Sequence, residues 1–197
     1  MQKDLDKILK RCLKNDQRAQ HELYHLCFER LMRICVKFQR NREDAAALLN
    51  DGFLKILLNL KKYDFEKDFF PWISTIMVRT AIDQYRKSKD YKETIDLHVD
   101  VYTYSGHDDA VVYNDVIDRM EQVEVDKMLH SLPENEKVVF NMFEMEGYAH
   151  KEIAEMLNIS ERSSKRYLQS AKARLKEMLE KKTEIKKVVW CQESGIN

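Results

Sequence analysis

The chain has 197 residues, 44% of them hydrophobic, and it contains only four Gly and two Pro beside abundant Lys, Glu, Leu and Met. A composition so poor in helix breakers predicts a mostly α-helical globular protein. The longest apolar stretches are too short to span a bilayer, and the charged N-terminus lacks the apolar core of a signal peptide, so we expect no membrane span and a cytoplasmic protein.

The 34 basic and 34 acidic residues cancel in number but are segregated along the chain. Residues 1–90 carry 19 Lys and Arg against 13 Asp and Glu, and residues 158–187 carry ten against four. Between them, residues 91–126 carry two basic residues against ten acidic ones. Because each basic segment has a local excess of charge, the net value of zero does not exclude a nucleic-acid partner.

The first half of the chain has helical periodicity. Apolar residues recur at helical spacing from Leu5 to Arg40, and a further helix is expected from Glu43 to Leu60. The inward stripe of that helix is Leu49, Phe53, Leu57 and Leu60. Residues 61–68 are expected to form a loop, and the next helix has Pro71 in its first turn and runs to about Ser88.

The second half follows an acidic linker at 91–120, which is rich in Val, Tyr and Asp. Ser131 and Glu134 have the spacing of a capping box for a helix that ends at Gly147. Two short helices are expected at 150–157 and 161–180. The sequence therefore predicts an all-α protein with two helical domains, at 1–90 and 121–182, and a tail at 183–197.

Residues 148–176 have the pattern of a helix-turn-helix. Asn158 suits the left-handed position after the first helix, Ile159 fills the gap between the helices, and Ser160 caps the second. The outward residues at the start of the second helix, where such motifs contact DNA, are Arg162, Ser163, Lys165, Arg166 and Tyr167. The alternative is an ordinary helical hairpin with a solvated, charged face.

Residues 61–90 are rich in both aromatic and basic side chains. Exposed rings beside cations suit single-stranded DNA, because bases stack on rings while cations hold phosphates. Tyr63 and Phe65, in a charged loop, are difficult to explain as core residues. For Phe69 and Trp72 the alternative is that they simply belong to the hydrophobic core.

Two further sequence patterns, an H-E-x-x-H match and the cysteines, predict no functional site. His21-Glu22-Leu23-Tyr24-His25 matches the zinc-protease motif H-E-x-x-H, but the usual third ligand does not follow it, so no metal is expected. Four cysteines, at positions 12, 27, 35 and 191, have no zinc-binding spacing. Cys27 and Cys35 lie among apolar helix positions and are expected to be buried free thiols.

Three segments in register resemble extracytoplasmic-function sigma factors: EDAAALLNDGFLKIL (43–57), FFPWISTIMVRTAIDQYRK (69–87) and LPENEKVVFNMFEMEGYAHKEIAEMLNISERSSKRYLQSAKARL (132–175). The resemblance extends from about residue 10 to residue 180. It implies a sigma factor that binds core RNA polymerase through the β′ and β subunits and directs promoter recognition, DNA melting and transcription initiation. It implies no cofactor, no catalytic residue and no chemistry of its own, and it allows an anti-sigma partner.

The resemblance also assigns roles to positions of this chain. Polymerase binding falls on Leu49, Asp51, Phe53 and Leu54. Melting and reading of the minus-ten element fall on Lys62, Tyr63, Trp72, Arg79, Asp83, Arg86 and Lys87, and reading of the minus-thirty-five element on the outward residues of the helix-turn-helix. The acidic linker would pass near the nucleic-acid channel of the polymerase.

Several positions depart from the family pattern. Ala47 and Asn50 replace a common Asp and Gln, and Arg79 replaces a common Asn. Ser164 stands where an apolar residue is usual, and Ala149 where a Ser or Thr often caps. These departures bear on affinity and promoter choice. Two hypotheses compete with this one. The first is a stand-alone helix-turn-helix repressor or activator, which would normally dimerise and needs no polymerase, and the second is a zinc hydrolase.

Overall fold

The computed structural model describes residues 2–94 and 125–193, with side chains described at 4–88 and 125–181. The described residues form helices and no strand, which confirms the all-α prediction. They separate into two compact units, Met1–Asp108 and Asp109–Asn197. The predicted acidic linker at 91–120 lies outside the described residues, apart from the end of one helix.

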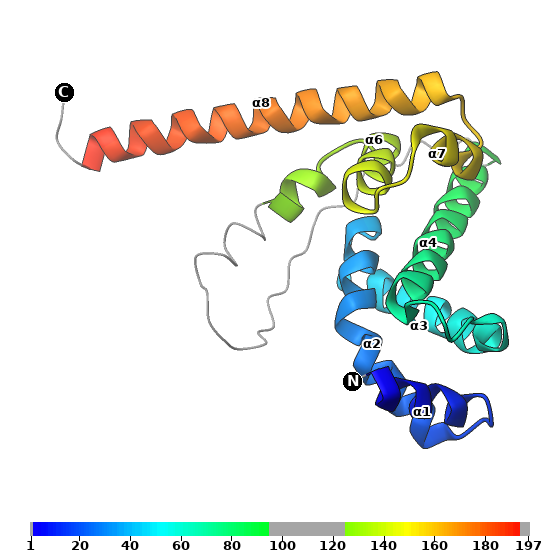
Figure 1. Ribbon diagram of the computed structural model, residues 1–197. Coiled ribbons are helices and arrows are strands. Elements are labelled where there is room, and N and C mark those ends of the chain that lie inside the picture. Colours follow the sequence, from blue (N-terminus) through cyan, green and yellow to red (C-terminus); the bar gives the residue numbers. More distant parts are fainter. Residues whose placement is uncertain (1, 95–124, 194–197) are drawn as a thin grey trace. The chain divides into compact units, whose positions relative to one another are not determined.

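The first unit contains α1 (Gln2–Cys12), α2 (Gln17–Phe38), α3 (Arg42–Asn59), the short 3-10 helix η1 (Leu60–Lys62) and α4 (Phe69–Thr94) (Figure 1). The chain turns between α1 and α2 at Asn15, whose φ is 60°. Asp16 then caps α2 by accepting hydrogen bonds from the backbone N–H of Arg18 and Ala19. The expected helical region from Leu5 to Arg40 is therefore two helices rather than one.

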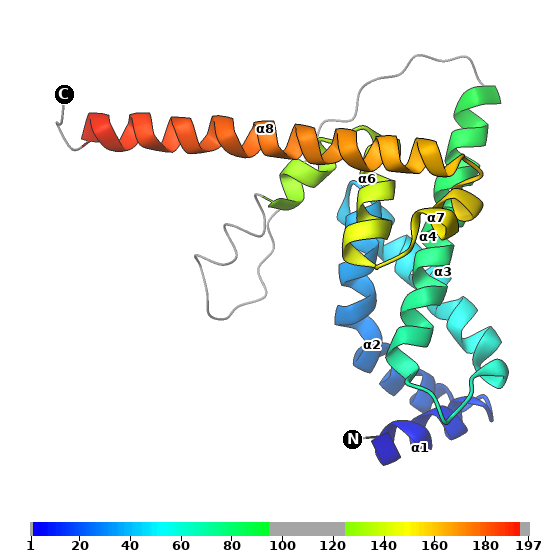
Figure 2. The ribbon, with the colours of Figure 1, turned by 45° about the horizontal axis from the view of Figure 1, so that its top comes forward.

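Helices α2, α3 and α4 pack side by side around one hydrophobic core (Figure 2). Fully buried side chains from all three helices fill it, among them Leu23, Leu49 and Ile73. Asn41 starts α3 as its cap, with its side chain 2.7 Å from the backbone N of Asp44. Pro71 lies in the first turn of α4, as expected, and α4 continues past Ser88 to Thr94.

The second unit contains α6 (Glu134–Phe140), a π-helical turn η2 (Asn141–Met145), α7 (His150–Leu157) and the long α8 (Glu161–Glu193). The predicted capping box is wrong, because the Ser131 hydroxyl donates to the carbonyl of Met128, and Pro133 is the residue before α6. Ser131 instead follows a helical turn at 125–130. The chain leaves η2 through Gly147, whose φ is 76°.

The cysteines of the first unit are part of the hydrophobic core. Cys12, Cys27 and Cys35 are buried free thiols, which confirms the expectation for the last two. Burial raises the pKa of Cys27 and of Cys35 to about 12. Cys191 lies outside the described side chains. None of the described helices is long and apolar enough to cross a membrane.

Candidate nucleic-acid interface

The turn between α7 and α8 has the helix-turn-helix geometry that the sequence predicted. Asn158 adopts the left-handed conformation, with φ 53° and ψ 48°. The Ser160 hydroxyl oxygen lies 3.0 Å from the backbone N of Ser163, so it caps α8. Ile153 and Leu157 of α7 pack inward, as do Leu168 and Ala171 of α8. These contacts fix the angle at which the start of α8 leaves the unit.

The residues of α8 that were predicted to contact DNA lie at its N-terminal end. Arg162, Lys165 and Arg166 are exposed, while Ser163 and Tyr167 are half-buried. The Arg166 guanidinium lies 5.3 Å from the centre of the Tyr167 ring, which orients both side chains. A capped helix end with three exposed cations can contact phosphates and base edges in a major groove.

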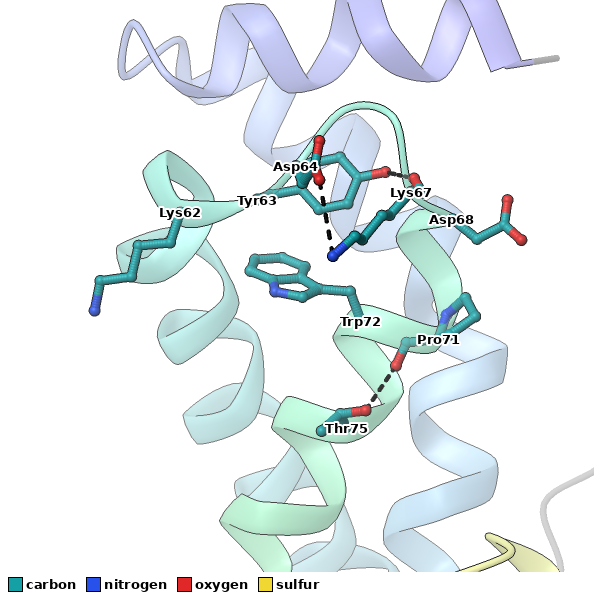
Figure 3. A pocket seen from close by; sticks show the side chains of 8 residues that line it. All are labelled: Lys62, Tyr63, Asp64, Lys67, Asp68, Pro71, Trp72 and Thr75. Atoms are coloured by element: carbon teal, nitrogen blue, oxygen red, sulfur yellow. Dashed lines mark hydrogen bonds and ion pairs between the residues drawn. The ribbon is translucent and has the colours of Figure 1, made fainter.

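An open pocket of about 370 Å³ lies between η1 and the start of α4 (Figure 3). Its walls include the Trp72 indole and the Tyr63 ring, whose centres are 5.1 Å apart. Cations and carboxylates surround the rings: the lining residues are Lys62, Tyr63, Asp64, Lys67, Asp68, Pro71, Trp72 and Thr75. Such a pocket, with an aromatic wall and polar rim, has the composition of a site for a flat polar ring.

Tyr63 is buried, contrary to the expectation from the sequence. It was expected to be an exposed ring, but it is only 6% exposed and packs against Phe69 and Trp72. Its hydroxyl donates to the carbonyl of Lys67, which holds the loop closed over it. Burial raises the pKa of this phenol. Tyr63 therefore forms a wall of the pocket, whereas Phe65 and Trp72 are partly accessible.

The exposed face of α4 carries the remaining residues of the predicted minus-ten set, Arg79, Asp83, Arg86 and Lys87. Asp83 is already engaged within the protein, because its carboxylate lies 3.2 Å from Nζ of Lys55 on α3. One residue further along, Gln84 donates to Asp51 at 3.0 Å. The basic side chains of this face therefore remain available to an anionic partner, while the carboxylate of Asp83 is partly neutralised by Lys55.

Two of the four predicted polymerase-binding residues are inaccessible. Leu49 is 1% exposed and Phe53 is 8% exposed, because both belong to the inward stripe of α3. Leu54, by contrast, is 56% exposed, and Asp51 is exposed beside it. Leu58, which was not among the predicted site residues, is 71% exposed and lies one helical turn after Leu54 on the same face. The apolar i, i+4 spacing was the available signal.

The zinc-protease motif does not assemble a hydrolase site. His21 and His25 are exposed on α2 with their Nε2 atoms 3.1 Å apart, but the Glu22 carboxylate is bound by Arg11 at 3.2 Å. Within the described side chains, no group of three or more His, Cys, Asp or Glu residues could hold a metal ion.

Comparison with known proteins identifies the family. The model of the ECF sigma factor family matches residues 2–181. The chain belongs to the ECF sigma factor family. This sigma factor binds core RNA polymerase and directs promoter recognition, DNA melting and transcription initiation.

Relatives of the sigma factor support the same assignment. It is 24% identical over 159 residues to the ECF RNA polymerase sigma factor SigM of Bacillus subtilis, covering 79% of this chain and 91% of the relative. It is 27% identical over 168 residues to ECF RNA polymerase sigma factor SigM of Mycobacterium tuberculosis, covering 83% and 79%. The fold resembles that of the sigma factor RpoE from Bartonella quintana, solved with the anti-sigma factor NepR (TM-score 0.53, 17% identity, 81% and 96% covered).

Proposed function

We propose that the two units of this sigma factor divide its work. Residues 1–90 bind core polymerase and read the minus-ten element, and residues 121–182 read the minus-thirty-five element. The observation that carries this proposal is the capped N-terminal end of α8, which presents Arg162, Lys165 and Arg166 to solvent. The protein performs no chemistry of its own and acts in the cytoplasm, where polymerase and promoter meet.

Polymerase docks on the outer face of α3. Leu54 and Leu58 are large apolar side chains that are exposed to solvent, whereas the other leucines of α3 are buried or half-buried. Exposed apolar side chains on adjacent turns commonly mark a protein interface. This face replaces Leu49 and Phe53 as the docking surface and retains the predicted Asp51. An anti-sigma protein that covered the two exposed leucines would compete with polymerase.

The pocket beside Trp72 receives a base flipped out of the minus-ten element. Unpairing and unstacking a base costs a few kcal/mol, and stacking on an aromatic ring returns about 1–3 kcal/mol. Lys62 at the rim of the pocket is suited to an adjacent phosphate, while the ammonium of Lys67 lies 3.8 Å from the Asp64 carboxylate. Arg79, Arg86 and Lys87 along α4 extend the cationic surface away from it.

Reconstitution tests this proposal. Core polymerase is combined with the purified protein, and the transcripts made from fragmented genomic DNA of the source organism are sequenced. We expect new start sites that share two conserved elements and that core polymerase alone ignores. A protein that fails to bind core polymerase, or that binds duplex operator DNA as a stable dimer without it, would refute the proposal.

A further inference from the structure

Helix α8, which is the recognition helix of the helix-turn-helix in the proposed function, carries a buried serine that the promoter-reading role does not explain. Ser164 is 0% exposed, although it lies between Ser163 and Lys165, two of the predicted DNA-contacting residues. Its backbone N–H donates to the carbonyl of Ser160 at 3.0 Å, as in a regular helix. Its side chain faces the interior of the helix-turn-helix, where an apolar residue would ordinarily pack.

The partner of this serine is His150, the first residue of α7. Ser164 Oγ and His150 Nδ1 are 2.9 Å apart, so they share a hydrogen bond between the two helices of the motif. The imidazole also stacks on Phe143 of η2, with ring centres 4.4 Å apart and planes inclined by 22°. The ring is therefore held in one orientation by a stack on one element and a hydrogen bond on another.

A hydrogen bond constrains a helix differently from an apolar contact. It requires a defined distance and direction, whereas an apolar side chain tolerates small rotations of its helix. Rotation or sliding of α8 would break the bond to His150 and leave a buried hydroxyl poorly satisfied. The same movement would displace Ser163 and Lys165, because neighbouring residues on a helix are fixed to one backbone.

We propose that His150 is a positioning residue for promoter recognition: through Ser164 it fixes the rotation and register of the recognition helix against α7. The inference rests on the proposed role of α8 in reading the minus-thirty-five element. His150 does not itself contact DNA in this scheme. It determines where the DNA-contacting residues on either side of Ser164 meet the groove.

The experiment compares full-length variants bound to core polymerase. His150→Phe keeps an aromatic ring against Phe143 but loses the hydrogen bond to Ser164. His150→Asn loses the ring stack but keeps a hydrogen-bonding atom close to the position of Nδ1. The measured quantity is the ratio of affinities for the mapped promoter and for the same promoter with a scrambled minus-thirty-five element, at several salt concentrations.

We expect His150→Phe to lower this ratio by about three- to tenfold, the range for a single buried hydrogen bond, and His150→Asn to retain most of it. The salt dependence should stay the same in both variants, because no phosphate contact is removed. Ser164→Ala should lower the ratio similarly, and the double variant His150→Phe/Ser164→Ala no further, since both changes remove one shared contact.

An unchanged ratio in His150→Phe and Ser164→Ala would overturn the proposal. So would a shallower salt dependence in both His150 variants, which would show a direct phosphate contact. Affinity for core polymerase and the melting temperature serve as controls for folding. If the wild-type protein binds core polymerase but shows no preference for the intact element, the proposed role of α8 has failed instead.

Discussion

At the scale of single residues, Gly52 of α3 leaves room for the side chain of Met77 on α4. A Cβ atom on Gly52 would lie 2.4 Å from Cε and 2.5 Å from Sδ of Met77. Met77 is fully buried, and its sulfur lies 3.4 Å from Sγ of Cys35. Because a buried methionine has few other places to go, a side chain at position 52 would compete with Met77 for the same space.

We expect Gly52→Ala to destabilise the wild-type protein but to stabilise a Met77→Ala variant. Alanine is favoured over glycine inside a helix by about 1 kcal/mol, while overpacking a core costs about 1–3 kcal/mol. The Met77→Ala change removes the atoms that would clash, so only the helix preference remains. Denaturant unfolding of the four proteins measures both effects. A rise in stability on Gly52→Ala in both backgrounds would show that Met77 moves aside freely.

The exposed leucines of α3 give a second prediction at this scale. We expect Leu58→Ser to weaken binding to core polymerase by about tenfold or more, because burying a leucine at an interface contributes about 1.5–3 kcal/mol. The melting temperature should barely change, since the side chain is exposed in the free protein. The measurement is competition for core polymerase by fluorescence anisotropy.

Leu26→Ser is the matched control, because this leucine is also exposed but lies on α2. It should bind core polymerase more tightly than Leu58→Ser does. Equal affinities of Leu58→Ser and the wild-type protein would remove the outer face of α3 from the docking surface.

At the scale of helices and turns, the sequence predicted best where one side chain decides one backbone conformation. Asn158 and Ser160 could be assigned because a left-handed residue and a helix cap each have a short list of suitable side chains. Ser131 was misread because the same hydroxyl can cap one helix or bond back to the preceding one, as it does here. The choice depends on the position of the preceding turn, which local spacing does not determine.

The candidate sites were predicted less completely than the helices. A family resemblance assigns roles to positions of the chain, but whether a side chain at such a position is buried depends on how its helix is rotated toward its neighbours. Leu49 and Phe53 were assigned both to the inward stripe and to the polymerase, and the structure buries both side chains in the core. Tyr63 has charged neighbours in sequence, yet aromatic residues that follow it in the chain enclose its ring. Neither outcome follows from spacing along one segment.

The cationic end of α8 leads to a prediction about salt. We expect Lys165→Ala to weaken promoter binding and to reduce the slope of log affinity against log salt by about 1, because one phosphate contact is lost. Lys181→Ala removes the same charge further along α8, where Lys181 is paired with Glu177 at 2.7 Å, and should leave the slope unchanged. Filter binding of the polymerase complex across a salt series measures both. An unchanged slope in Lys165→Ala would show that this side chain does not touch the DNA backbone.

The pocket at the start of α4 leads to a prediction about melting. We expect Trp72→Ala to reduce open-complex formation more strongly than closed-complex binding, because only a flipped base would stack on the indole. Reactivity of promoter thymines with permanganate measures opening, and complex formation at low temperature measures closed binding. Thr75→Ala, which alters the pocket wall without removing an aromatic ring, is the control. Loss of both steps together with loss of helicity would instead assign Trp72 to the core.

At the scale of the whole molecule, the charge distribution and the packing divide the chain in the same way. The basic excess of residues 1–90 and that of residues 158–187 fall in different compact units. Each unit has buried side chains of its own, such as Leu48 and Ile56 in the first and Val139 and Met142 in the second. Two independently stable modules could engage two separate promoter elements without a shared core.

Independent stability of the two units can be measured because the chain has only two tryptophans, Trp72 and Trp190. In a Trp190→Phe background, fluorescence reports the first unit alone. Leu49→Ala should lower the melting temperature that Trp72 fluorescence reports by about 10 °C or more. Deleting a buried leucine lowers the free energy of unfolding by about 2–5 kcal/mol, and each kcal/mol lowers the Tm of a domain of this size by about 4–8 °C. Ile153→Ala truncates an equally buried side chain in the second unit and should leave the melting temperature of the first unit unchanged. If Ile153→Ala lowers it as much as Leu49→Ala, the two units unfold as one cooperative body, and the division of promoter recognition between them loses its physical basis.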